Sequence, residues 1–285
     1  MEAADAVLPI LVHVQANLDA DLALGTLAAR AGYSPFHFHR AFEDEVGETL
    51  KAHVLRLRLE RAAFRLGFHA GPIVAIALDC GFGGHETFTR AFRRHFGVTP
   101  SAYRRGERSG SDPAAGPGIM RTPGVSSLST TRLASLPATH VAFIRHVGPY
   151  EKVDPALWTT LRDWSAGRAL TAPPVMLGIG HDSPATTPPH RLRFDAAIAV
   201  PGPFPAEGAI GHQVLPACLY ALTSHAGSYD ELASAYATIF ARLFARDDLM
   251  IVGLPVIEVY HTTRIDPGRA MNHTDIYIPV LRKEG

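Results

Sequence analysis

Cysteine is scarce in this sequence, which contains only Cys80 and Cys218 and no C-x-x-C pair. This excludes a disulfide framework and the common cysteine-based zinc sites, and the apolar neighbours of both residues indicate reduced core positions. There is also no run approaching 18 apolar residues, and no basic segment with a small-residue cleavage site at the start. We therefore expect a soluble, cytoplasmic protein with no membrane partner.

Signatures of catalytic and cofactor sites are missing as well. The sequence has no H-E-x-x-H motif, no glycine-rich phosphate loop and no G-x-S-x-G elbow. His37 and His39 are two positions apart, so on a helix they point in different directions. We expect no catalytic residue, no metal and no cofactor.

Neither sign of charge is in excess, because 27 Lys and Arg balance 27 Asp and Glu. No attraction of the whole molecule to nucleic acid follows from that balance. The charges are unevenly distributed, however: residues 30–108 hold 13 basic and 8 acidic residues, whereas residues 109–285 hold 14 and 15. Any DNA binding should therefore be confined to the front of the chain.

The chain is long enough for two domains. Of its 285 residues, 47% are hydrophobic and 19% charged, which is ordinary for a globular protein. Residues 106–124 are rich in Gly, Pro and Ser, a composition typical of a flexible linker. We place a first domain at residues 1–108, the linker at 109–125 and a second domain at 126–285.

The run from Cys80 to Arg105 predicts a tight turn followed by a short amphipathic helix. Glycines at positions 81, 83 and 84 suit the turn, and Gly97 stands where the helix would end. Apolar residues recur at helical spacing from Phe88 to Phe96, so one face should be buried. The other face is polar and carries arginines; taken alone, it is either a solvated surface or a reader of DNA.

An upstream copy of this run, displaced by 50 residues, favours the second interpretation. The matching residues of the copy are Phe38, Arg40, Ala41, Phe42, Gly47, Thr49 and Ala52. Ser34 is a natural N-cap and Pro35 fits the first helical position, so the copy predicts a helix from Pro35 to about Glu45. A long helical pattern at residues 48–66 joins the two copies, and its basic residues are expected to form a solvated face. The sequence thus predicts two helix-turn-helix units in tandem.

These units resemble the AraC/XylS family of transcription regulators. The matching residues are Leu27-Ala28, Gly32, Ser34, Arg40-Ala41-Phe42-Glu43, Gly81-Phe82, Phe88-Thr89-Arg90-Ala91-Phe92, Phe96-Gly97-Val98-Thr99-Pro100 and Tyr103-Arg104. The resemblance implies an all-α domain whose two recognition helices bind successive major-groove segments of double-stranded promoter DNA. The DNA contacts that it implies are Phe36, His37, His39, Arg40, His85, Glu86, Thr87, Thr89, Arg90 and Arg94. Glu86 departs from the amide side chain often found in the family, and it could either accept a hydrogen bond from cytosine or repel phosphate.

A second internal repeat lies behind the linker, at an offset of 79–80 residues. Leu136-Pro137-Ala138 matches Leu215-Pro216-Ala217, and the strand pattern that begins at Asp195 matches the one that begins at Asp275. A helical pattern follows the first strand of each copy. Residues 126–285 are therefore predicted to form an α+β domain with two duplicated β-α-β-β halves around a ligand groove.

This second domain resembles the GyrI-like effector-binding domain. The matching residues are His146-x-Gly-Pro-Tyr150, Asp182-Ser-Pro184, Arg193-Phe-Asp195, His225-x-Gly-x-Tyr229, Pro255-x-x-Glu258-x-Tyr260 and Asp275-Ile-Tyr-Ile-Pro279. The resemblance implies binding of an amphipathic, often cationic, small-molecule effector. Together the two resemblances imply a cytoplasmic, nucleoid-associated transcription regulator, an activator that works with RNA polymerase as a monomer or homodimer.

Glu258 is the expected centre of the ligand site. Strand alternation places it on one face with Val256 and Tyr260, and leaves open whether that face is solvated or buried. A buried carboxylate would need a partner. The GyrI-like resemblance favours a groove in which an organic cation pairs with the carboxylate and contacts aromatic rings. The expected aromatic walls are Tyr150, Trp158, Phe194, Tyr229, Tyr260 and Tyr277.

An alternative function follows from the same residues. Some GyrI-like relatives hydrolyse reactive toxins with a glutamate and a tyrosine that activate water, so Glu258 and a groove tyrosine could form such a pair. The chain would then sequester or hydrolyse its ligand. The DNA-binding domain in front favours a sensor over an enzyme.

Overall fold

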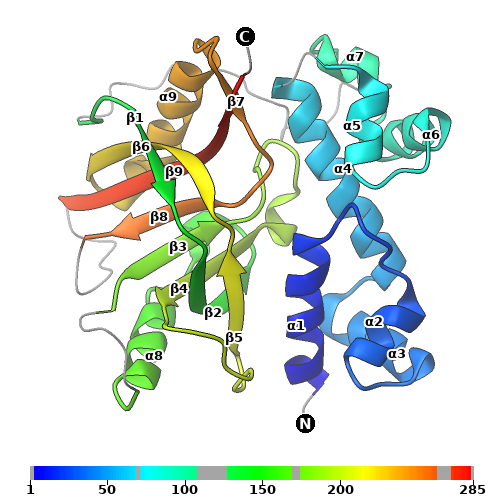
Figure 1. The fold of residues 1–285 in the computed structure, drawn as a ribbon, viewed down its shortest axis with the longest axis horizontal. Helices are drawn as coiled ribbons and strands as arrows, with labels where there is room; N and C mark the ends of the chain where they lie inside the picture. Colours follow the sequence, from blue (N-terminus) through cyan, green and yellow to red (C-terminus); the bar gives the residue numbers. More distant parts are fainter. Residues whose placement is uncertain (1–2, 69–70, 108–126, 169–173, 262–270, 284–285) are drawn as a thin grey trace. The chain divides into compact units, whose positions relative to one another are not determined.

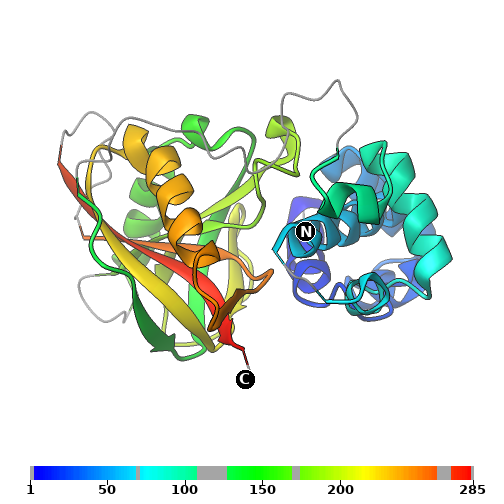
Figure 2. The same ribbon diagram turned by 90° about the horizontal axis from the view of Figure 1, so that it is seen from above.

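The structure is a computed structural model, which describes residues 3–68, 71–107, 127–168, 174–261 and 271–283. They form two compact units, one helical and one with a sheet and helices (Figures 1 and 2). The predicted fold class, an all-α domain followed by an α+β domain, is confirmed. The predicted linker at 109–125 lies outside the described residues, so the exact domain boundary stays a prediction.

Two helix-turn-helix units make up the helical domain, as the repeat predicts. Its helices are α1 (Ala3–Ala16), α2 (Leu24–Arg30), α3 (Pro35–Val46), α4 (Leu50–Phe68), α5 (Ile73–Asp79), α6 (His85–Phe96) and α7 (Pro100–Arg104). Ser34 Oγ accepts the backbone N–H of His37 at 3.3 Å and so caps α3. Both α3 and α6 end at a left-handed glycine, Gly47 with φ 72° and Gly97 with φ 76°.

Each unit has its own core, and α4 contributes to both. Phe38 and Phe42 are fully buried in the first core, and Phe88 and Phe92 occupy the equivalent places in the second. The first half of α4 packs against the first core through residues 50–57, and its second half packs against the other core through residues 59–66. One helix therefore fixes the spacing of the two recognition helices.

Of the basic residues of α4, Lys51 is exposed as its sequence pattern predicts, but the arginines do not form a solvated face. Arg56 is buried, with its guanidinium 2.6 Å from the Glu48 carboxylate and 3.2 Å from that of Glu60. Arg58 donates to the backbone carbonyls of Leu18 and Ala20 at 2.7 and 2.8 Å. Arg56 is thus satisfied within α4 and the residues just before it, as a buried guanidinium requires, whereas Arg58 joins α4 to the segment between α1 and α2.

The second domain contains one curved sheet and two longer helices. Its strands are β1 (Arg132–Leu136), β2 (Thr139–Val147), β3 (Met176–Gly180), β4 (Arg193–Ala199), β5 (Ile210–Leu215), β6 (Cys218–Gly227), β7 (Leu249–Ile251), β8 (Val256–Tyr260) and β9 (Asn272–Arg282). The helices are α8 (Ala156–Ser165) and α9 (Leu232–Phe244), each preceded by a 3-10 turn, Tyr150–Lys152 and Tyr229–Glu231.

The strand order has the symmetry of the sequence repeat. It runs β1-β6-β9-β8-β3-β4-β2-β5, with β7 on β9. The counterparts in the two halves are β1 and β5, β2 and β6, β3 and β8, and β4 and β9. When each strand is replaced by its counterpart, the same order is obtained in reverse. The equivalent strands β3 and β8 pair antiparallel at the centre, and Gly178 lies directly opposite Glu258. Since these two residues are 80 positions apart, the offset of the repeat, a pseudo-two-fold axis passes between them.

The short strand connections make the sheet curve. β1 and β2 are six places apart in the strand order, about 29 Å in a flat sheet, yet Pro137 and Ala138 alone join them and span at most about 11 Å. The edges of the sheet must therefore approach each other at this end (Figure 1). Trp158 of α8 and Tyr236 of α9 both contact β8, at Tyr260 and Glu258, so both helices cover the same face.

We predict that Gly81→Ala destabilises the helical domain more than Gly32→Ala, its counterpart in the first unit. Both glycines have positive φ, 80° and 73°, so alanine costs roughly 1–2 kcal/mol at either position. A Cβ at Gly81 would also lie 2.5 Å from the Leu18 carbonyl oxygen and 2.7 Å from Arg58 Nε, whereas at Gly32 it meets nothing within 4 Å. The overlap should add about 1–3 kcal/mol at Gly81. Urea unfolding followed by the helical circular dichroism signal measures both; equal losses would contradict the prediction.

Candidate functional site

The open face of α6 presents most of the residues predicted to contact DNA. His85, Glu86, Thr87, Arg90 and Arg94 are all exposed. Together with Thr89, Arg93 and Thr99, several of them line a surface hollow of about 690 Å³. Within the described part of the chain, no acidic side chain forms an ion pair with the arginines of this helix. Their N–H donors are therefore free to meet an anionic surface.

The corresponding face of α3 presents the other predicted contacts. Phe36 is 68% exposed, which is unusual for a phenylalanine, and its ring lies 5.9 Å from that of His37. Arg40 is exposed, and His39 is half-buried with its Nδ1 3.6 Å from the Glu43 carboxylate. An exposed ring next to polar donors can contact both a thymine methyl group and base edges.

Thr89 differs from its neighbours. Its side chain is half-buried, and the hydroxyl oxygen has almost no exposed surface. The sequence pattern predicts Thr89 on the exposed face, whereas its hydroxyl is covered in the structure. The roles of all these residues in DNA contact remain predictions.

Glu258 is the most unusual group of the second domain. Its side chain is buried in β8, 7% exposed, and its carboxylate accepts hydrogen bonds from the hydroxyls of Tyr236, at 2.7 Å, and Tyr260. Burial raises the pKa of Glu258 above its ordinary value of 4.5, and the two tyrosine hydrogen bonds offset only part of that shift. No basic side chain of the described residues is paired with it.

Two other buried carboxylates of this domain have arginine partners. Arg193 donates to both oxygens of Asp182, at 2.7 and 2.9 Å, and Arg145 donates to both oxygens of Asp195, at 2.8 and 2.9 Å. Burial alone would raise the pKa of either carboxyl, but the guanidinium charges hold both pKa values below the usual range. Glu258 thus differs from both in lacking a cation.

Five of the six predicted aromatic walls form one connected group around Glu258. Ring centroids are 5.8 Å apart for Tyr150 and Phe194, 6.0 Å for Phe194 and Trp158, 5.5 Å for Trp158 and Tyr260, and 5.7 Å for Tyr260 and Tyr229. The Trp158 indole donates to the Leu177 carbonyl at 2.9 Å, which fixes its ring against the centre of the sheet. The group reaches the buried carboxylate through Tyr260, whose hydroxyl donates to Glu258.

Tyr277 does not belong to this group. In β9 it is paired with Ile257, and paired residues of antiparallel strands share a face. Ile257 points away from Glu258, so Tyr277 lies on the opposite face of the sheet, where it packs against Tyr220 at 5.9 Å. Including it among the walls was wrong, because strand alternation does not reveal how β9 is registered against β8.

Tyr236 is the site residue that sequence reasoning missed. Tyr236 lies in the apolar pattern of its helix, yet its hydroxyl reaches Glu258 from α9. A signal was available: Tyr236 is 78 residues beyond Trp158, and the buried Leu161 of α8 and Ile239 of α9 have the same separation. The repeat therefore places Tyr236 where α8 has its tryptophan.

Gly178, opposite Glu258, provides the space for this arrangement. A Cβ at Gly178 would lie 2.6 Å from Phe194 Cζ and would overlap the Tyr260 hydroxyl. Any side chain here would displace the tyrosine that donates to Glu258.

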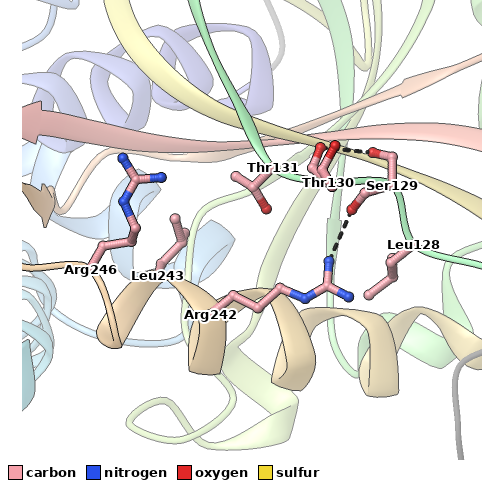
Figure 3. Close-up of a pocket in the computed structure, with 7 residues that line it drawn as sticks. All are labelled: Leu128, Ser129, Thr130, Thr131, Arg242, Leu243 and Arg246. Atoms are coloured by element: carbon pink, nitrogen blue, oxygen red, sulfur yellow. Dashed lines mark hydrogen bonds between the residues drawn. The ribbon is translucent and has the colours of Figure 1, made fainter.

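A smaller hollow of about 290 Å³ lies beside α9, lined by Leu128, Ser129, Thr130, Thr131, Arg242, Leu243 and Arg246. Figure 3 shows Arg242 reaching across it to the Ser129 carbonyl, at 2.9 Å. Arg246 is bound to Asp248 by two hydrogen bonds, of 2.7 and 2.6 Å. Both arginines thus have structural partners, and the hollow is a weaker candidate for a site than the surroundings of Glu258.

None of the described helices has the length and hydrophobicity of a membrane span. Among the described residues, no group of three or more His, Cys, Asp or Glu side chains is placed to hold a metal ion.

Comparison with known proteins identifies both domains. Residues 130–281 match the model of the GyrI-like small molecule binding domain, and residues 27–106 match that of a helix-turn-helix domain. Right origin-binding protein of Escherichia coli K12 is 40% identical over 105 residues, which are 37% of this chain and 36% of that protein. This chain thus spans just over a third of the length of that relative.

Regulatory protein SoxS of Escherichia coli K12 is 35% identical over 95 residues, 33% of this chain and 89% of SoxS. Among solved structures, the crystal structure of the EcmrR C-terminal domain is 23% identical, with a TM-score of 0.45, and the match covers 54% of this chain and 98% of that one. The chain belongs to the GyrI-like small molecule binding domain family, with an AraC-type helix-turn-helix domain in front.

Proposed function

We propose that this protein is a transcription regulator that binds promoter DNA through its helical domain and a small-molecule effector through its GyrI-like domain. The observation that carries the proposal is the pair of recognition helices, α3 and α6, which repeat the same buried residues and leave polar faces open. Such a pair fits two successive segments of the major groove, about one helical turn apart. The relatives named above include a regulatory protein and an origin-binding protein.

We further propose that the regulator works in the cytoplasm on nucleoid DNA, as an activator in contact with RNA polymerase. Selection of bound sites from random DNA, with and without effector candidates, tests the function as a whole. A protein that selected no sequence under either condition would not be a sequence-specific regulator.

The effector is proposed to be an organic cation that contacts Glu258. A buried carboxylate without a cation is costly, and a ligand that brings a positive charge removes that cost. The rings of Trp158 and Tyr260 add cation–π attraction, which is stronger where water is excluded. To reach the carboxylate, the ligand must displace at least one tyrosine hydroxyl, so binding should rearrange the contact between Tyr236 on α9 and Glu258.

Hydrolysis of the ligand is less well supported. A carboxylate that activates water needs an oxygen that can take the proton of that water. In Glu258, each oxygen already accepts a hydrogen bond from a tyrosine hydroxyl. This arrangement favours binding over catalysis.

We predict that Glu258→Gln weakens binding of an aryl quaternary ammonium ion at least about tenfold, because the buried charge pair is lost. The neutral isostere of this ligand, with carbon in place of nitrogen, should lose much less affinity when Glu258 is replaced by Gln. Titration is followed by tryptophan fluorescence, to which Trp158 and Trp164 both contribute. The matched control is Tyr277→Phe, on the opposite face, which should leave cation binding unchanged, whereas Tyr260→Phe should alter it. Equal binding of the cation by wild type and Glu258→Gln would refute the proposed site.

The pH dependence of cation binding gives a separate prediction. Only the ionised form of Glu258 attracts a cation, and burial raises its pKa above 4.5. As pH falls, affinity should therefore begin to drop at a higher pH than an ordinary glutamate would allow. Glu258→Gln should abolish this pH dependence, and a wild-type affinity that stays constant down to pH 4.5 would contradict the assignment.

We predict that Arg90→Ala costs on the order of 1–3 kcal/mol on the selected DNA site and relaxes the preference for one base, if Arg90 reads a base edge. Arg40→Ala, at the equivalent position of α3, is the matched comparison for the other half of the site. Binding is measured by fluorescence anisotropy on the selected duplex and on single-base variants of it. A uniform loss on every sequence, with a shallower salt dependence, would instead make Arg90 a phosphate contact.

A further inference from the structure

The two recognition helices carry opposite charges at equivalent positions. Residues 43–45 of α3 are Glu, Asp and Glu, and residues 93–95 of α6, displaced by the repeat offset of 50, are Arg, Arg and His. All six side chains are exposed, while the phenylalanines just before them, Phe42 and Phe92, are both fully buried. The fold is thus the same at the two places, and only the charge differs.

The difference extends over both helices. α3 carries one arginine and three acidic residues, a net charge of −2, whereas α6 carries three arginines and one glutamate, a net charge of +2. Stability of the helix does not explain the acidic residues of α3. They lie at its C-terminal end, where the helix dipole favours positive charge. The arginines at the same end of α6 stabilise their helix through the same dipole.

The surroundings of the two helices also differ. Arg90, Arg93 and Arg94 line the hollow of about 690 Å³ on α6, together with the hydroxyl-bearing Thr99. In α3 the acidic Glu43 lies beside His39, which is one of the predicted base contacts. A DNA phosphate placed in the hollow of α6 would meet three guanidinium groups and one carboxylate, that of Glu86. The end of α3 offers only carboxylates, which point to different sides of the helix.

We infer that the two helix-turn-helix units divide the work of DNA binding. α6 anchors the protein through phosphate contacts of Arg93 and Arg94, and α3 adds sequence discrimination with little electrostatic attraction. The exposed Phe36 fits this role, because an apolar contact to a thymine methyl group depends little on salt. The inference rests on the proposed DNA-binding function and adds which half of the domain supplies its affinity.

Two matched double variants of the full chain test the division. Arg93→Ala/Arg94→Ala removes charge from α6, and Glu43→Ala/Asp44→Ala removes charge from the equivalent positions of α3. Each is titrated over a range of salt concentrations against two probes: a duplex that the wild-type protein selects from a random pool, and a random-sequence duplex of the same length. Helical circular dichroism and thermal unfolding establish that the variants are folded.

The α6 variant should bind both duplexes at least about tenfold more weakly at low salt. Its slope of log affinity against log salt should become shallower by about 1.8, roughly 0.9 for each phosphate that the protein no longer neutralises. Arg93→Lys/Arg94→Lys should recover most of that slope, since lysine keeps the charge. The α3 variant should bind as tightly as wild type or more tightly, and it should keep the preference for the selected duplex.

The inference is overturned if the α6 variant keeps the wild-type salt slope, or if the α3 variant loses as much affinity as the α6 variant. The first result would show that Arg93 and Arg94 do not anchor the complex, and the second would show that the two units contribute equally to affinity. Failure of the proposed function looks different: the wild-type protein would then select no duplex and would bind neither probe with measurable salt dependence.

Discussion

A carboxylate removed from water without a basic partner is the constraint around which the second domain is arranged. Glu258 accepts hydrogen bonds from Tyr260 of its own strand and from Tyr236 of α9, so the carboxylate ties helix to sheet at one point. The equivalent position across the pseudo-two-fold axis is Gly178, and the space beside it is filled by Tyr260 and Phe194. Two glutamates facing each other across this axis would repel, because like charges that close cannot both ionise. The symmetric fold therefore holds one carboxylate at its centre.

The other motif residues of this domain build the frame that holds the site. Asp182 is bound by Arg193, and the Tyr150 hydroxyl donates to the Asp182 backbone carbonyl at 2.6 Å. That tyrosine begins the chain of rings that leads through Phe194 to Trp158. A buried ion pair contributes little net stability by itself, but losing one partner would leave the other charge buried and unpaired. The pairs thus hold the frame in which the aromatic rings lie, and among the described residues Glu258 is the buried carboxylate beside them without a basic partner.

Local patterns in the sequence predict much of this structure, and long-range register accounts for most of what they miss. The helices α3 and α6 follow from apolar spacing, the Ser34 cap and the closing glycines, all of which act within one or two turns. The face of Tyr277 depends on how β9 aligns with β8, and a shift of one residue would reverse it. The burial of Arg56 is different, because Glu48, Arg56 and Glu60 are spaced by multiples of four residues. Helical periodicity places all three on one side of α4, so these ion pairs could have been predicted from the local sequence.

Duplication explains why the fold is easier to predict than the chemistry. In both domains many of the repeated residues are those that pack, such as Phe42 and Phe92 in the helical domain and the paired strands β3 and β8 in the other. Elsewhere the copies differ in charge, as with Glu258 opposite Gly178 and the acidic residues 43–45 opposite the basic residues 93–95. A core tolerates few changes because its close packing penalises each one, whereas an exposed surface can change charge at little cost to the fold. Comparing the two copies of each domain therefore reveals the charges that distinguish them, whereas a repeated exposed residue such as Arg40, which matches Arg90, is recognised only from its exposure.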